Sequence, residues 1–183
     1  MDRRQTANIL IVEDEEIVAM DIKDMLTGLG YNVVGMTNSG EEAVIEIEKM
    51  EPDLVLMDIM LGQEKSGIET AEEIRRNFNL PVIYITAYAD HNTVERAKKT
   101  APYGYILKPF QEKDINTAIT MALYKHKLMM EIKTETENAL AAITGTVELM
   151  LEEAPTKYDK DTIVRIDIIQ RAVNKIKQAI DRI

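Results

Sequence analysis

The 183-residue chain contains no cysteine, which excludes disulfide bonds and thiolate chemistry and fits a reducing cytosol. It also contains no apolar run approaching the roughly 20 residues of a membrane span. Residues 1–6 are polar and lack the apolar core of a signal peptide. We therefore expect a cytoplasmic protein that makes no membrane contact.

Basic residues are outnumbered by acidic ones, 22 Lys/Arg against 32 Asp/Glu, which gives the chain a formal net charge of −10. Residues 126–183 hold nine Lys/Arg against ten Asp/Glu, so the acidity belongs to the first 125 residues. Non-specific nucleic-acid binding depends on cationic contacts to phosphates, which this balance disfavours. The C-terminal part has neither a basic stripe nor a helix-turn-helix pattern, so we expect no DNA binding.

Short apolar runs alternate with amphipathic stretches through the first 125 residues. This pattern predicts five strands, over Asn8–Val12, Tyr31–Thr37, Leu54–Asp58, Pro81–Thr86 and Tyr103–Lys108. It predicts helices over Glu16–Leu29, Gly40–Met50, Ile68–Asn77 and Asp90–Lys99, and a long helix from Gln111. Ser39 and Glu42 form an expected capping box. Five successive βα units predict an α/β fold with a flavodoxin-like parallel sheet of order 2-1-3-4-5.

The last third of the chain is different, because apolar-leaning residues recur there at heptad spacing. The first seam comprises Ile115, Ile119, Ala122, His126, Met129, Lys133, Thr136, Leu140, Ile143, Val147 and Met150, and the second comprises Ile166, Ile169, Val173, Ile176, Ile180 and Ile183. A loop containing Pro155 is expected between them, over Glu152–Asp161. We predict a domain over residues 1–125 and a helical hairpin over 126–183 that continues its last helix. Two arms alone bury little core, so we expect a homodimer in a four-helix bundle.

Polar side chains follow four of the predicted strands. Glu13 and Asp14 follow the first strand, and Asp58 ends the third. These strands are neighbours in the order 2-1-3, so the acids converge, and clustered carboxylate oxygens suit Mg²⁺. Thr86 and Lys108 end the fourth and fifth strands and face the same cluster. A carboxylate, a metal and an ammonium group together suit phosphoryl chemistry.

At these strand ends the chain resembles the response-regulator receiver family. The matching segments are Val12-Glu13-Asp14, Leu56-Met57-Asp58, Ile85-Thr86-Ala87 and Lys108-Pro109-Phe110. The resemblance covers residues ~7–125 and implies that Asp58 is the phosphoacceptor of a partner sensor histidine kinase. It also implies that Asp14 and Asp58 ligate Mg²⁺ with the Met60 backbone carbonyl, that Glu13 supports the metal through water, and that Thr86 and Tyr105 form a switch pair.

The segment after Asp58 departs from the family pattern. Residues 59–67 lack the usual proline and look one residue longer than in the commonest members. Met60 and Tyr88 stand where the family tunes dephosphorylation. Their bulk predicts a long-lived phosphoryl group, because it would hinder water.

The stretch Glu131–Met150 resembles the dimerisation and phosphotransfer helix of sensor histidine kinases. The matching residues are Glu135, Asn138, Leu140, Ile143, Gly145, Glu148 and Leu149. Thr134 occupies the position of the phosphorylatable histidine, and a threonine lacks the imidazole that would carry phosphate there. The tail is therefore either a degenerate kinase hairpin or an ordinary heptad hairpin, and both interpretations predict a dimer.

Three functional classes remain open on the sequence alone. The first is a phosphorylation switch that acts through protein contacts of the helical dimer and is not itself an enzyme. The second is an RNA-binding antiterminator-type regulator, disfavoured by the near-neutral tail. The third is a Mg²⁺-dependent phosphatase, disfavoured because Met60 stands two residues after Asp58, where a second catalytic acid would be required.

Overall fold

The computed structural model describes residues 6–62, 66–87 and 91–180, except for the side chains of residues 91, 92, 94 and 153–157. The chain divides into two compact units, Met1–His126 and Lys127–Ile183. In the described part of the chain, no helix has the length and apolar character needed to cross a membrane.

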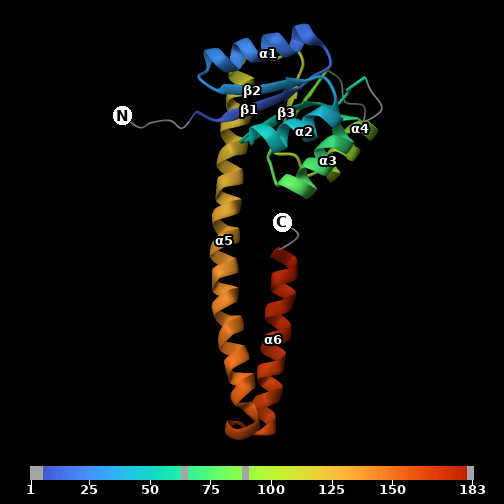
Figure 1. The fold of residues 1–183 in the computed structure, drawn as a ribbon. Coiled ribbons are helices and arrows are strands. Elements are labelled where there is room, and N and C mark those ends of the chain that lie inside the picture. Colours follow the sequence, from blue (N-terminus) through green and yellow to red (C-terminus); the bar gives the residue numbers. More distant parts are fainter. Residues whose placement is uncertain (1–5, 63–65, 88–90, 181–183) are drawn as a thin grey trace. The chain divides into compact units, whose positions relative to one another are not determined.

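The first unit contains the predicted parallel sheet. Its strands are β1 (Asn8–Val12), β2 (Asn32–Thr37), β3 (Leu54–Asp58), β4 (Val82–Thr86) and β5 (Gly104–Leu107). They pair in the order β2-β1-β3-β4-β5 (Figure 1). Every residue of β3 and β4 is buried, as continuous apolar runs in the middle of a parallel sheet should be. The predicted fold class and strand order are thus confirmed.

Helices cover both faces of this sheet. They are α1 (Glu16–Gly28), α2 (Gly40–Met50), α3 (Gly67–Phe78) and α4 (His91–Lys99), followed by the long α5 (Glu112–Lys157). One apolar cluster joins α1 and the start of α5 to the sheet, through residues such as Ile22 and Ile119. A second cluster joins α2, α3 and α4 to the opposite face, through residues such as Ile47, Ile74 and Ala97. The sheet is therefore the middle of three layers.

The helix caps correct one detail of the sequence prediction. At Ser39 the structure shows half of the expected capping box, in which the Ser39 hydroxyl accepts from the Glu42 N–H at 3.2 Å. A complete box was missed at Ser66, where Glu69 accepts from the Ser66 N–H at 3.0 Å and donates its own N–H to the Ser66 hydroxyl. The Ser-x-x-Glu spacing of residues 66–69 carried this signal.

Tyr84 is the largest fully buried side chain of β4 and carries a polar group into the core. Its hydroxyl lies 2.9 Å from Thr100 Oγ1, which in turn donates to the Ala97 carbonyl at 2.7 Å. Burial raises the pKa of Tyr84 to about 12. This hydrogen bond fastens the chain just after α4 to the middle of the sheet.

Tyr84→Phe is expected to lower the free energy of unfolding by about 1 kcal/mol, because it deletes a buried hydrogen bond while keeping the ring. Urea unfolding followed by circular dichroism measures the change. Tyr124→Phe is the matched control, since Tyr124 is 61% exposed. Equal effects of the two substitutions would show that the Thr100 bond contributes nothing.

The second unit is a helical hairpin formed by α5 and α6 (Lys160–Ile180). The predicted loop over Glu152–Asp161 is wrong, because α5 continues through Pro155 to Lys157 and α6 begins at Lys160. A proline inside a helix removes one backbone hydrogen bond, and α5 ends two residues after it. Asp159 starts α6 by accepting from the Thr162 N–H at 2.7 Å, as an N-cap residue does.

The predicted seams are only partly buried within one chain. Among their described members in the hairpin, the buried residues are Leu140, Val147, Ile166, Val173 and Ile180. Ile143, Ile169 and Ile176 are exposed, and Ile183 lies outside the described residues. Each arm therefore has one apolar stripe against its neighbour and a second stripe facing solvent.

Candidate functional site

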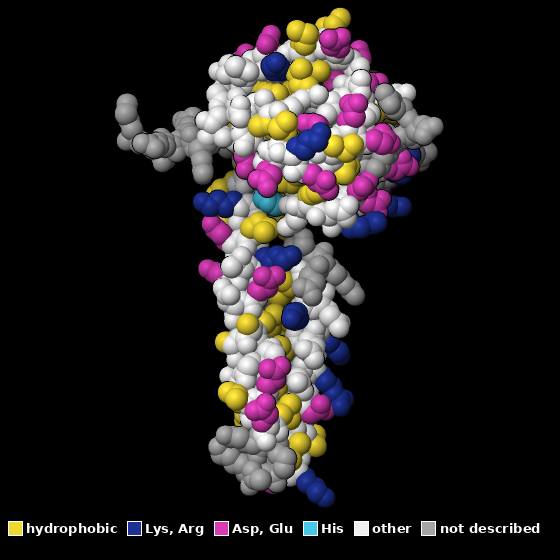
Figure 2. All heavy atoms as spheres, viewed as in Figure 1, with side chains coloured by type: hydrophobic (Ala, Val, Ile, Leu, Met, Phe, Trp, Pro, Cys, Tyr) yellow, Lys and Arg dark blue, Asp and Glu magenta, His cyan; other side chains and the backbone are white. Residues whose placement is uncertain are grey.

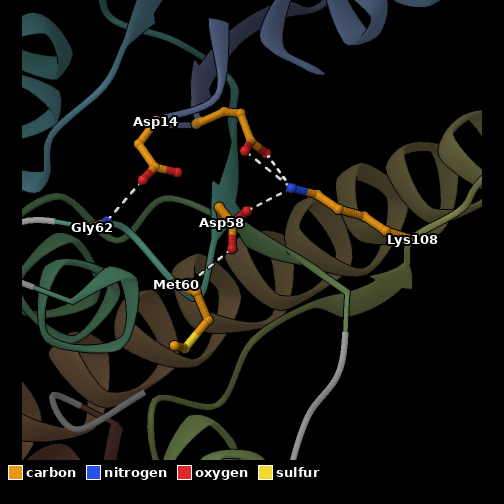
Figure 3. A network of polar contacts seen from close by, with 6 residues as sticks. Asp14, Asp58, Met60, Gly62 and Lys108 are labelled. Carbon is orange, nitrogen blue, oxygen red and sulfur yellow. Dashed lines mark hydrogen bonds and ion pairs between the residues drawn. The ribbon is translucent and has the colours of Figure 1, made fainter. Parts of the chain in front are cut away.

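Three carboxylates meet at the carboxyl edge of the sheet (Figure 3). Glu13 and Asp14 directly follow β1, and Asp58 ends the adjacent strand β3. Each contributes a ligand-capable oxygen, and these oxygens lie within 4.8 Å of one another. Glu13 is 2% exposed and Asp58 5% exposed, whereas Asp14 is open to solvent. The convergence predicted from the strand ends is present, with one side of the cluster accessible.

Lys108 brings the positive charge to this cluster. It follows β5, and its backbone N–H donates to the Thr86 carbonyl at 2.8 Å. Its Nζ donates to Glu13 Oε1 and Oε2 at 3.0 and 2.8 Å, and to Asp58 Oδ2 at 2.7 Å. The Lys108–Pro109 peptide bond is cis. One ammonium group thus bridges the two buried acids.

Burial and charge act in opposite directions on these groups. Burial raises the pKa of Glu13 to about 7, even though the hydrogen bond from Lys108 lowers it. Burial alone would lower the pKa of Lys108, but its hydrogen bonds to Asp58 and Glu13 raise it above the ordinary value. The lysine therefore remains charged at neutral pH, which is what a group that neutralises anionic oxygens requires.

Backbone groups of the loop after β3 orient the acids. The Met60 N–H donates to Asp58 Oδ1 at 2.7 Å, and the Gly62 N–H donates to Asp14 Oδ2 at 2.9 Å. The Met60 side chain is 67% exposed. The role expected for its carbonyl remains a prediction, and residues 63–65 and Tyr88 lie outside the described part.

Gly67 supports this loop from the first turn of α3. A Cβ at residue 67 would stand 1.9 Å from the Asp58 carbonyl oxygen and 3.2 Å from the Ile59 Cα. Only glycine allows such a close approach of two backbones. No sequence pattern indicates this contact, because it depends on how the loop returns to the sheet.

Thr86 ends β4 beside the acids. It is 1% exposed, and its Oγ1 is, within the described residues, a buried side-chain oxygen without a hydrogen-bond partner. Buried polar atoms normally have partners, and leaving one unpaired costs about 1–3 kcal/mol. An unpaired hydroxyl at a strand end is a feature that an incoming oxygen could satisfy.

Tyr105 lies on β5 directly opposite Tyr84 in the strand register. It is 39% exposed, and its ring centroid lies 5.7 Å from that of Tyr84 at an interplanar angle of 35°. The ring therefore packs on a core tyrosine and does not bond the free hydroxyl of Thr86.

Two further residues singled out from the sequence lie apart from this site. Thr134 is exposed on α5 in the second unit. His126 is half-buried, with Nδ1 3.0 Å from the Tyr103 hydroxyl, and burial lowers its pKa. Neither residue takes part in the acidic cluster.

The fold and the acidic edge together agree with one family. A model of the response regulator receiver domain matches residues 9–120. The chain belongs to the response-regulator receiver family. The receiver part of the predicted resemblance is thereby confirmed, whereas kinship of the tail with histidine kinases is not.

Two bacterial regulators are similar to this chain over part of their length. The chain is 35% identical over 127 residues to the transcriptional regulatory protein PdtaR of Mycobacterium tuberculosis, a match that covers 69% of this chain and 62% of PdtaR. It is 38% identical over 117 residues to the phyllosphere-induced regulator PhyR of Methylorubrum extorquens, covering 63% of this chain and 43% of PhyR. It therefore spans less than two thirds of either relative.

A solved structure supports the same assignment. The signal receiver domain of a modulated diguanylate cyclase from Desulfovibrio desulfuricans is 41% identical, with a TM-score of 0.65 over 67% of this chain and 98% of that one. Receiver domains are phosphoacceptor switches, and they imply a histidine kinase as phosphodonor. They typically bind Mg²⁺ at an acidic site, and the described part of this chain holds a cluster of three carboxylates that could hold a metal ion.

Proposed function

We propose that this chain is a two-component response regulator in which a sensor histidine kinase phosphorylates Asp58. In this proposal the helical hairpin passes the signal on through protein contacts and does not bind DNA. The observation that carries the proposal is the position of Asp58, buried at the end of β3 and held by Lys108 Nζ at 2.7 Å.

The transfer itself moves one phosphoryl group. A carboxylate oxygen of Asp58 attacks the phosphorus of the kinase's phosphohistidine, a P–O bond forms, and the P–N bond breaks with its electron pair leaving on the imidazole nitrogen. Lys108 lies close enough to Asp58 to neutralise charge on the phosphoryl oxygens as they arrive. The unpaired Thr86 hydroxyl can then donate to one of those oxygens.

The carboxylate cluster fits a divalent cation, because hard oxygen ligands at an open edge suit Mg²⁺. Asp14 and Asp58 would hold the ion by their side chains, the Met60 carbonyl would complete the protein ligands, and Glu13 would act through water. When bound, the ion supplies positive charge to the phosphoryl group. The accessibility of Asp14 supports this assignment, since the ion must be reached from solvent.

Thr86 and Tyr105 form the proposed switch. After phosphorylation the Thr86 hydroxyl engages the phosphoryl group, and Tyr105 turns inward from its exposed position on Tyr84. The present arrangement supports a resting state, because Thr86 Oγ1 is unpaired and the Tyr105 ring is 39% exposed. A change of ring position at β5 would alter the surface that a partner protein meets.

The hairpin is the proposed output module and dimerises. The hairpin either descends from a kinase dimerisation domain or is an ordinary bundle. In both cases Thr134 cannot form a phosphohistidine, so the phosphoryl group is not passed on from Asp58 to the hairpin. RNA binding by an antiterminator-type output is the second candidate, motivated by similarity to a transcriptional regulatory protein. Salt-sensitive retention of RNA by the chain would favour that candidate.

Intact-mass measurement tests the proposal. Incubation with Mg²⁺ and acetyl phosphate is expected to add ~80 Da, one phosphoryl group, to the wild-type chain. Asp58→Asn should take up none, because it removes the nucleophilic carboxylate. An adduct of equal yield on the Asp58→Asn chain would refute the assignment.

A further inference from the structure

Isoleucines are exposed on both arms of the hairpin, although isoleucine is among the residues most often buried. Ile143, Ile169 and Ile176 are 44%, 47% and 48% exposed, and Ile132 is 63% exposed. Hydrophobic side chains are also visible along the surface of the hairpin in Figure 2. Scattered exposed apolar residues are normal, so their arrangement decides whether they form a surface.

Helix geometry places these residues on one side of the hairpin. At about 100° per residue, Ile143 lies about 60° and 40° from the buried Leu140 and Val147. Ile176 and Ile169 lie about 60° and 40° from the buried Val173, in the same rotational sense. Because the two helices run antiparallel, equal rotations away from their contact lead to the same side. We call this side the isoleucine face.

The opposite side of the hairpin carries charged residues around a groove. The groove is lined by Glu137, Thr144, Glu148 and Lys177, together with Ala141, Gly145 and the buried Leu140 and Ile180. The same geometry rotates the charged residues of α5 and α6 away from their contact in the sense opposite to the isoleucines. These charged residues distinguish the groove side from the isoleucine face, and one exposed apolar face is what half a four-helix bundle presents.

The two arms also carry opposite charge. Residues 127–157 of α5 contain six Asp/Glu and three Lys/Arg, a net charge of −3, whereas residues 160–180 of α6 contain two Asp/Glu and five Lys/Arg, a net charge of +3. Opposite net charges on two helices favour packing of the helices side by side, and like net charges disfavour it. An acidic arm is therefore expected to avoid a second acidic arm and to pack beside a basic one.

A second copy of the chain can cover the isoleucine face in two symmetric ways. A two-fold axis along the helices sets α5 against the partner's α6, while an axis across them sets α5 against the partner's α5. Both bury the same isoleucines, but only the first places acidic arms beside basic arms throughout. We infer that a second copy packs on the isoleucine face with α5 beside the partner's α6, so that like helices lie diagonally.

The heights of the isoleucines bring them within reach of one another in this arrangement. Leu140 clusters with Val173 and Ile180 within the hairpin, so Ile143 lies about 4 Å along the helix axis from the level of Ile176. The axis along the helices preserves this offset, and Ile143 then packs beside the partner's Ile176. The inference rests on the proposed function in taking the hairpin as an output module that dimerises, and it adds the face and the helix pairing.

Sedimentation equilibrium of the full chain tests the face. The wild-type chain is expected to be a dimer, and the double variant Ile143→Glu/Ile176→Glu a monomer at concentrations at least 100-fold above the wild-type Kd. Both isoleucines are exposed in the single chain, so circular dichroism should show the helices retained. Ala141→Glu on the groove side is the matched control and should remain a dimer. A monomeric wild type, or a dimer that survives the double variant, would overturn the inference.

Disulfide trapping tests the helix arrangement, and the absence of native cysteine makes it unambiguous. Thr146→Cys on α5 and Ala172→Cys on α6 are exposed positions at matching heights. Differently tagged chains, each with one substitution, are mixed and oxidised. A mixed disulfide is expected, and dimers that yield none would contradict α5 packing beside the partner's α6. The face variants should still accept phosphoryl groups, so failure here leaves the Asp58 assignment intact.

Discussion

Lys108→Met is expected to slow phosphorylation of Asp58 by about 100-fold or more, the usual effect of removing one group that stabilises developing charge. The ammonium group lies 2.7 Å from Asp58 Oδ2 and also bonds both oxygens of Glu13. Without it, the incoming phosphoryl oxygens meet two buried carboxylates that have lost their shared ammonium partner. Methionine fills similar space, so the packing around residue 108 changes little.

The rate is measured by intact mass against time with acetyl phosphate in excess Mg²⁺. Lys49→Met is the matched control, because Lys49 makes only an exposed ion pair with Glu46, which contributes little. Circular dichroism of both variants excludes unfolding as the cause. Phosphorylation of the Lys108→Met chain at the control's rate would remove Lys108 from the transfer step.

Mg²⁺ is expected to raise the free energy of unfolding by about 2.7 kcal/mol when its concentration is 100 times its Kd, because it binds the folded cluster and not the unfolded chain. Asp14→Asn should abolish most of this gain, since it removes an open carboxylate from the set of three. The cluster itself explains the effect, because without a metal ion the carboxyl groups of Glu13, Asp14 and Asp58 lie close together beside a single bonded ammonium group, that of Lys108.

Urea unfolding at increasing Mg²⁺ measures this effect without reference to phosphorylation. Asp21→Asn on the exposed surface of α1 is the matched control and should respond to the metal like wild type. Chelation with EDTA should return wild type to its metal-free stability. An Asp14→Asn chain stabilised as much as the control would place the ion elsewhere.

The strand order and the meeting of Asp14, Asp58 and Lys108 were predictable from sequence. Both follow from one regularity, since apolar runs of strand length mark a parallel sheet and the residues that end them share an edge. Thr86 was predicted at this edge for the same reason. The dashed contacts in Figure 3 show that Lys108 reaches this edge as expected.

Contacts that depend on how a loop folds back onto the sheet were not predictable. The close approach of Gly67 to the Asp58 carbonyl and the bond between Tyr84 and Thr100 join residues whose spacing has no periodic signal. The predicted hairpin loop was misplaced because a proline usually ends or kinks a helix, whereas α5 continues for two residues beyond Pro155. The heptad periodicity also did not predict which seam residues are buried within one chain. Ile143 and Val147 belong to the same seam, but Val147 is buried and Ile143 is exposed.

The receiver and the hairpin fit one sequence of events. In the proposed function, phosphorylation at Asp58 satisfies Thr86 and draws Tyr105 inward, and the resulting change would occur at β5, which precedes the helix that enters the hairpin. A dimer formed through the isoleucine face would present two receiver domains to a protein that binds it. The coupling between the two units is a hypothesis based on the continuity of α5 from Glu112 to Lys157.

Locating the phosphoryl group is the most direct test of the central claim. The wild-type chain is phosphorylated with acetyl phosphate and Mg²⁺, reduced with borohydride, which attacks acyl phosphates, and digested for peptide sequencing by mass spectrometry. The modification is expected at Asp58 alone. Reduction of any other carboxyl group in its place, at Asp14 or Glu13 above all, would contradict the account.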